Sequence, residues 1–157
     1  MKKILFVCLG NICRSAAAEA VMTSLVEKAG LTDDFYIDSA GILSVHKGEP
    51  ADNRMRKHAA QRGYNVTSIS RPVQKVDFQI FDIIVGMDNA NIDDLMDKLP
   101  SVEMQQKIVK MTDFCEHSKH DYVPDPYYGG DAGFELVLDI LEDACAGFLK
   151  SITCVNN

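Results

Sequence analysis

Residues Ile4–Ser15 read ILFVCLGNICRS, and this stretch says most about the fold. Its apolar first half is typical of a buried strand, and an Ala-rich helical pattern follows directly from Ala16. A strand therefore leads into a tight loop that opens a helix, where backbone N–H groups and the helix dipole favour an anion. Cys8 enters this loop and Arg14 leaves it. A thiolate and a guanidinium would face the same small volume, which suits attack on a bound phosphate.

Strand and helix patterns alternate along the rest of the chain. Strands are predicted at residues 3–7, 35–39, 81–85 and 107–109, and helices at residues 16–29, 52–61 and 89–98 and after Gly130. The last helix should bury one face, made of Phe134, Leu138, Leu141, Cys145 and Phe148. Repeated β–α units predict an open parallel sheet with helices on both sides, and such sheets bind ligands beyond the carboxyl ends of their strands. Cys8 lies at such an end.

Composition narrows the class of protein. A chain of 157 residues with 46% apolar and 25% charged residues fits one globular domain. No apolar run approaches the roughly 20 residues that span a bilayer, so we expect no membrane insertion. The net charge of −7 argues against nucleic-acid binding, and it means that affinity for an anion must be local. Five cysteines form no pairing pattern, which favours the reducing cytoplasm.

The residue types inside the loop fit an activated thiol. The helix start, the loop amides and Arg14 favour the thiolate of Cys8, and Ser15 can donate one more hydrogen bond. We expect Gly10 to adopt a backbone conformation closed to other residues, and Asn11 to take left-handed dihedrals and brace the loop. The alternative is a buried cysteine beside a solvated arginine. A Cys and an Arg that flank five residues at a strand-to-helix turn favour the nucleophile.

Two separated motifs resemble one family. CLGNICRS at residues 8–15 and DPYYGG at residues 125–130 closely resemble the low-molecular-weight protein tyrosine phosphatases. The resemblance spans the chain and includes DSAG at residues 38–41 and Met87-Asp88. It implies an α/β fold of three layers, flavodoxin-like and of phosphotyrosine protein phosphatase I type, with a four-stranded parallel sheet. It also implies a single domain over residues 1–157 and a cysteinyl-phosphate mechanism without metal or cofactor.

The resemblance assigns roles to individual residues. Cys8 is the nucleophile, Arg14 clamps the phosphate, and Asp125 is the general acid. Ser15 supports the thiolate, and Asn11 holds the loop through Ser39. The phosphate-binding residues are Leu9, Gly10, Asn11, Ile12, Cys13, Arg14 and Ser15. The substrates are phosphotyrosine proteins or peptides and small aryl phosphates, and inorganic phosphate or other oxyanions would inhibit.

The chemistry of the reaction supports Asp125 independently. A tyrosyl oxygen leaves more easily as a phenol, so a carboxylic acid above it speeds the first step, and the carboxylate can then activate water. Pro124 and Pro126 stiffen the backbone around Asp125, and Tyr127 and Tyr128 offer aromatic walls for a phenyl ring. The alternative is a simple Pro-Asp-Pro turn with two surface tyrosines.

One further carboxyl group, of Asp88, and one further thiol, of Cys13, each have two candidate roles. Asp88 competes with Asp125 as the acid, but its place between a strand and a helix favours capping. Cys13 could capture oxidised Cys8 as a disulfide, or it could simply fill the loop. The other cysteines, Cys115, Cys145 and Cys154, are expected to be structural.

Several positions bear on the choice of substrate. Relatives that act on phosphoarginine carry threonine at the position of Ile12. The isoleucine of this chain resembles the relatives that act on phosphotyrosine. Many relatives have an aromatic residue at Val45, so that wall of the cleft should be smaller here. Ala16 replaces a frequent proline, and Ser68 stands where some members place a histidine that braces the loop asparagine. The basic segment at residues 46–58 either brings positive charge to the mouth of the site or forms a solvated helix face.

Two other functions remain open on the sequence. An arsenate reductase of the same fold also binds an oxyanion between Cys and Arg, but it needs a second pair of cysteines close by to relay a disulfide. A catalytically silent phosphoanion-binding module would need a geometric defect in the site.

Overall fold

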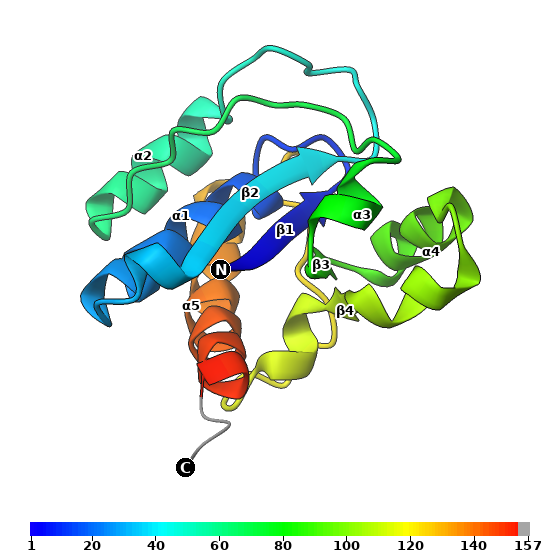
Figure 1. Ribbon diagram of the computed structural model, residues 1–157. Coiled ribbons are helices and arrows are strands. Elements are labelled where there is room, and N and C mark those ends of the chain that lie inside the picture. Colours follow the sequence, from blue (N-terminus) through cyan, green and yellow to red (C-terminus); the bar gives the residue numbers. More distant parts are fainter. Residues whose placement is uncertain (154–157) are drawn as a thin grey trace.

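Four parallel strands form the central sheet, as predicted. They are β1 (Lys2–Cys8), β2 (Phe35–Gly41), β3 (Ile83–Gly86) and β4 (Ile108–Lys110), in the order β2-β1-β3-β4 (Figure 1). The structure is a computed structural model and describes residues 1–153. Cys154, expected to be structural, lies outside the described residues.

Helices cover both faces of the sheet. Helices α1 (Arg14–Lys28) and α5 (Asp131–Thr153) pack together on one face, with α2 (Asn53–Gln61) against α5. On the other side lie the short α3 (Asp77–Ile80) and α4 (Asn89–Lys98) (Figure 1). Short 3₁₀ helices occupy Thr32–Asp34, Val102–Lys107 and Met111–Phe114. The sheet and the helices on its two faces therefore form three layers, as the resemblance implies.

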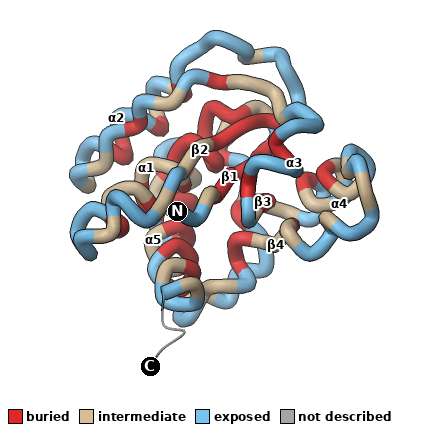
Figure 2. Tube along the Cα trace, viewed as in Figure 1, coloured by how far each residue is buried: buried red, intermediate tan, exposed pale blue. Residues whose placement is uncertain are grey.

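A hydrophobic core lies on each face of the sheet, and the buried strand β1 contributes to both cores (Figure 2). Alternate side chains point to opposite faces. Ile4 and Phe6 join the core beneath α1 and α5, whereas Leu5 and Val7 join the core beneath α3 and α4. No helix among residues 1–153 is long and apolar enough to cross a bilayer.

The local predictions differ from the structure mainly at element boundaries. Helix α1 begins at Arg14 rather than at residue 16, so the arginine is already part of the helix. Strand β3 begins at Ile83 rather than at residue 81, because Phe81 still closes α3 by donating its N–H to the carbonyl of Asp77. Helix α3 was not predicted, since its four residues are too few to show a helical period.

The last helix buries the predicted face, and all five of its expected core residues are inside. One glycine makes this packing possible. A Cβ atom at Gly147 would lie 1.9 Å from the carbonyl oxygen of Phe114, so the 3₁₀ helix Met111–Phe114 approaches α5 backbone to backbone. This contact fixes the segment that leads toward Asp125 against α5.

The order of the strands places the site. β1 pairs with β2 on one side and with β3 on the other, so the connections diverge at the carboxyl end of β1. Ligand sites of open parallel sheets form at such a point. Residues 9–13 occupy it, between Cys8 at the end of β1 and Arg14 at the start of α1.

Candidate active site

The Cys8 thiol sits at the base of a loop that folds around it. Its Sγ lies 3.0 Å from the Ser15 hydroxyl oxygen, and the backbone N–H of Asn11 donates to the same sulfur at 3.3 Å. Cys8 is 3% exposed. One loop group and one helix group therefore hold the sulfur in place.

Asn11 holds the loop through its side chain. Its Nδ2 donates to the Ser15 hydroxyl at 2.8 Å and to the Ser39 hydroxyl at 3.0 Å, so the predicted contact with Ser39 is present. The Ser39 hydroxyl donates onward to the carboxylate of Glu19 at 2.7 Å. Asn11 has a φ of 59°, the left-handed conformation that its sequence position suggested.

The other side of Asn11 is held by a residue that the sequence did not reveal. The backbone N–H of Arg71 donates to Asn11 Oδ1 at 3.1 Å, and the guanidinium of Arg71 pairs with Asp38 and Asp77. Ser68 was expected near this position. Its hydroxyl is buried and makes no hydrogen bond among the described residues, so the bracing comes from the Arg71 backbone instead.

The prediction that Gly10 adopts a backbone conformation closed to other residues is wrong. Gly10 is not among the glycines with a positive φ, so its backbone conformation is open to other residues. A Cβ atom there would lie 3.1 Å from Cδ2 of His46. A larger residue at this position would therefore push the imidazole of His46 outward.

Arg14 is buried, 3% exposed, and is held from two sides. Its Nη1 donates to Asp88 Oδ2 at 2.6 Å and to the carbonyl of Val123 at 3.1 Å, while Nη2 lies 3.6 Å from Asp125 Oδ2. Burial alone would lower the pKa of the guanidinium, but the neighbouring Cys8 and the two carboxylates raise it above its usual value. Arg14 therefore stays charged at the base of the site.

Asp88 has two partners. Its Oδ1 accepts the N–H of Asn91 at 2.8 Å, which is the capping interaction expected at the start of α4. Its Oδ2 accepts a hydrogen bond from Arg14, a contact that was not predicted from the sequence. The two oxygens join the start of α4 to the base of the phosphate loop.

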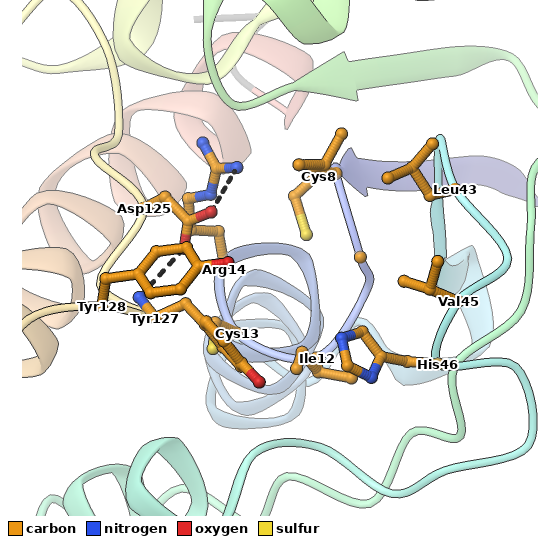
Figure 3. A pocket seen from close by; sticks show the side chains of 12 residues that line it. Cys8, Ile12, Cys13, Arg14, Leu43, Val45, His46, Asp125, Tyr127 and Tyr128 are labelled. Atoms are coloured by element: carbon orange, nitrogen blue, oxygen red, sulfur yellow. Dashed lines mark hydrogen bonds and ion pairs between the residues drawn. The ribbon is translucent and has the colours of Figure 1, made fainter.

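Asp125 faces the loop from a separate segment. Its Oδ1 accepts the N–H of Tyr127 at 3.0 Å, and Oδ2 points toward Arg14. Its side chain is 40% exposed, so the carboxyl group lies at the open side of the site. Figure 3 shows Asp125 and Arg14 on one side of the cavity and the Cys8 sulfur between them and the opposite wall.

These groups share one cavity of about 170 Å³. Its walls include all four predicted cleft residues, which are Ile12, Val45, Tyr127 and Tyr128. Leu43 and His46 also line it, although neither was predicted to (Figure 3). Val45 is 70% exposed and Tyr128 is 93% exposed, so both form a rim rather than a buried pocket.

Cys13 lines the same cavity as Cys8. Burial, together with nearby Asp52 and Cys8, raises the pKa of the Cys13 thiol far above its usual value. Cys13 therefore remains a thiol at neutral pH, which makes it a poor nucleophile.

The basic segment before and along α2 supplies little free charge to the cavity. Arg54 pairs with Asp52 at 2.9 Å and donates to the carbonyl of Tyr127 at 2.9 Å. Its guanidinium also lies 5.5 Å from the centre of the Tyr127 ring. Arg54 therefore positions the aromatic wall of the cavity.

Comparison with known proteins settles the family. The family model for low molecular weight phosphotyrosine protein phosphatases matches residues 3–155. The chain belongs to this family. Its members are protein tyrosine phosphatases, and solved structures of such phosphatases share the fold of this chain.

Individual phosphatases resemble the chain over nearly its whole length. A putative low molecular weight protein-tyrosine-phosphatase of Synechocystis is 45% identical over 150 residues, covering 96% of both chains. The mouse low molecular weight phosphotyrosine protein phosphatase is 38% identical over 149 residues, covering 95% of this chain and 94% of its own. The crystal structure of an Entamoeba histolytica protein tyrosine phosphatase, with Hepes in its active site, has a TM-score of 0.95, 54% identity and 97% coverage of each chain.

Proposed function

We propose that this phosphatase hydrolyses phosphotyrosine in proteins or peptides, and small aryl phosphates, through a phosphocysteine intermediate. The phosphate would lie in the loop of residues 9–13, against the backbone N–H groups and the start of α1. Arg14 would contact two phosphate oxygens and follow their charge into the transition state.

In the first step, the Cys8 thiolate attacks phosphorus opposite the phenolic oxygen. A sulfur–phosphorus bond forms and the phosphorus–oxygen bond breaks. Asp125, in its protonated form, transfers its proton to the leaving oxygen, so that tyrosine leaves as a neutral phenol. Its place at the open side of the cavity, facing Arg14 and Cys8, suits this transfer.

In the second step, the Asp125 carboxylate takes a proton from a water molecule as its oxygen attacks phosphorus. The sulfur–phosphorus bond breaks and returns the electron pair to Cys8 as a thiolate. Inorganic phosphate leaves, and Asp125 is again protonated. The hydrogen bonds from Ser15 and Asn11 stabilise the thiolate as it departs.

The observation that carries this proposal is the meeting of Cys8, Arg14 and Asp125 at one cavity, although Asp125 comes from a distant segment. Hepes carries a sulfonate, and its presence in the active site of the Entamoeba relative supports inhibition by phosphate and other oxyanions here. Aromatic and aliphatic walls at Tyr127 and Ile12 favour a phenyl ring over a guanidino group. We place this activity in the cytoplasm, where the thiols stay reduced.

The arsenate reductase alternative lacks support from the described cysteines. Cys145 is fully buried in α5, and neither it nor Cys115 lines the cavity of Cys8. Burial and the neighbouring Asp143 raise the pKa of the Cys115 thiol to about 11, which makes it a poor nucleophile. Neither thiol is placed to relay a disulfide from Cys8.

The test is hydrolysis of para-nitrophenyl phosphate and phosphotyrosine peptides without added metal. Cys8→Ser should be inactive, and Asp125→Ala should lose about 10²–10⁴-fold in kcat. Undiminished turnover by Cys8→Ser would overturn the mechanism, and an inactive but phosphate-binding wild type would indicate a silent binding module. Phosphoserine and phosphoarginine substrates, run in parallel, test the preference for tyrosine.

A further inference from the structure

A second cavity adjoins the catalytic one. It has a volume of about 230 Å³ and shares Ile12, His46 and Tyr127 with the catalytic cavity. Its wall continues along residues 49–53, the loop that leads into α2. A phosphotyrosine side chain in the first cavity would place its neighbours in the peptide beside the second.

His46 stands between the two cavities in a fixed orientation. Its Nδ1 lies 2.8 Å from Glu49 Oε2, its ring centre lies 6.1 Å from that of Tyr127, and its Cδ2 packs against Gly10. An ionised carboxylate only accepts hydrogen bonds, so Nδ1 carries the hydrogen. In the neutral imidazole, Nε2 is then a hydrogen-bond acceptor, and it has no partner among the described residues.

The charges around the second cavity favour binding of a positively charged side chain. Asp52 is paired with Arg54, whereas Glu49 pairs only with His46 among the described residues. When His46 is neutral, the charge of Glu49 is uncompensated. His46, which lines both cavities, therefore offers an acceptor nitrogen, and the second cavity carries the negative charge of Glu49.

We propose that the second cavity is a subsite for one residue flanking phosphotyrosine, and that it takes a side chain that donates hydrogen bonds, an ammonium group best. His46 is the specificity-determining residue, and Glu49 is a positioning residue that holds its tautomer. This inference rests on the proposed function, because it concerns the peptide around the phosphotyrosine.

Protonation of His46 would reverse the preference. A protonated His46 presents Nε2–H as a donor and compensates the charge of Glu49. The subsite would then bind an acidic flanking residue better than a basic one. The other titratable or charged groups that line the two cavities are Cys8, Cys13, Arg14, Asp52, Asp125, Tyr127 and Tyr128. Titration of the catalytic groups affects all phosphopeptides alike and cancels in a ratio.

The experiment compares phosphotyrosine peptides that differ only in carrying Lys, Leu or Glu at one flanking position, two positions on each side. The measured quantity is the ratio of kcat/KM between the Lys and Glu peptides at pH 8.0 and pH 5.5. For wild type, one position should favour Lys about tenfold at the higher pH, as one charge-assisted hydrogen bond would give. The preference should vanish or invert at the lower pH.

Variants assign the effect to the two residues. His46→Phe should flatten the pH dependence of the ratio, and Glu49→Gln should lower the ratio at pH 8.0. His117→Phe, at an exposed histidine outside both cavities, is the matched control and should behave as wild type. Hydrolysis of para-nitrophenyl phosphate by Glu49→Gln and His117→Phe checks that their catalytic cavities are intact. His46→Phe is judged only by the ratio between two peptides measured on the same variant, because His46 also lines the catalytic cavity.

Two results would overturn the inference. One is a wild-type ratio that is the same at every flanking position and at both pH values. The other is a position-dependent ratio that survives unchanged in both His46→Phe and Glu49→Gln. A wild type that does not hydrolyse aryl phosphates at all contradicts the proposed function, and this inference falls with it.

Discussion

Asp88 Oδ2 lies 2.6 Å from Nη1 of Arg14, while Asp88 Oδ1 caps helix α4. One carboxylate thus serves two neighbours that are unrelated in sequence. It orients the guanidinium at the base of the site, and it closes the first turn of a helix on the opposite face of the sheet.

These two roles of Asp88 can be separated by substitution. Asp88→Asn keeps a good helix cap but loses the charge, so it should unfold at nearly the wild-type denaturant concentration and lose about tenfold in kcat/KM as Arg14 loses its orientation. Asp88→Ala should show the same loss of activity and also a loss of about 1 kcal/mol in the free energy of unfolding. Full activity of Asp88→Asn would show that Val123 and Asp125 suffice to hold Arg14.

Asn11 combines a left-handed backbone with three side-chain hydrogen bonds. Asn11→Ala should lose both the bonds and the backbone fit, whereas Asn11→Gly loses only the bonds. Both variants should be at least tenfold weaker in kcat/KM, and Asn11→Gly should be more stable than Asn11→Ala by about 1 kcal/mol. Denaturant unfolding of the pair measures the backbone contribution, and equal stabilities would contradict it.

Much of the site follows from the sequence because its parts are local. The strand, the loop and the helix start occupy consecutive residues, so the surroundings of Cys8 are set by Asn11 and Ser15 within the same motif. The family resemblance supplied Asp125 and Ser39, which local sequence patterns alone would not connect to the loop.

The contacts that the sequence did not reveal come from sheet register. Arg14 and Asp88 are 74 residues apart, and Arg71 and Asn11 are 60 residues apart. Their meeting depends on how β1, β2 and β3 align and on the path of the segment beside β2, which periodicity does not encode. His46 was missed for the same reason, and the reason given for Gly10 was wrong because its close neighbour lies on another loop.

Cys13 gives a prediction about oxidation. Burial raises the pKa of the Cys13 thiol, so Cys13 stays protonated. Peroxide should therefore oxidise Cys8, the proposed nucleophile, first, and the Cys13 thiol should then capture it as a disulfide. Wild type treated with mild peroxide should recover its activity with a thiol reductant, whereas Cys13→Ser should lose activity largely irreversibly. Cys115→Ser is the control and should recover like wild type. Equal recovery in Cys13→Ser would refute the protective role.

Gly147 should be the least replaceable glycine of α5. A Cβ atom there would overlap the Phe114 carbonyl oxygen, so Gly147→Ala should cost about 2–3 kcal/mol in the free energy of unfolding. Gly133 is the matched control in the same helix, since a Cβ atom there meets Pro126 at an ordinary 3.6 Å. Gly133→Ala should gain about 0.5–1 kcal/mol. Thermal or denaturant unfolding measures both, and changes of the same sign would contradict the packing argument.

The distance along the chain between Cys8 and Asp125 has a consequence for biosynthesis. A ribosome-bound chain that has emerged only as far as α1 already contains Cys8, the proposed nucleophile, but it lacks the partners of Arg14 and the proposed proton donor. Those arrive with Asp88, Val123 and Asp125, and they are held only once α5 packs on α1. Hydrolytic activity should therefore appear late in synthesis and all at once. Turnover by a nascent chain would report completed folding.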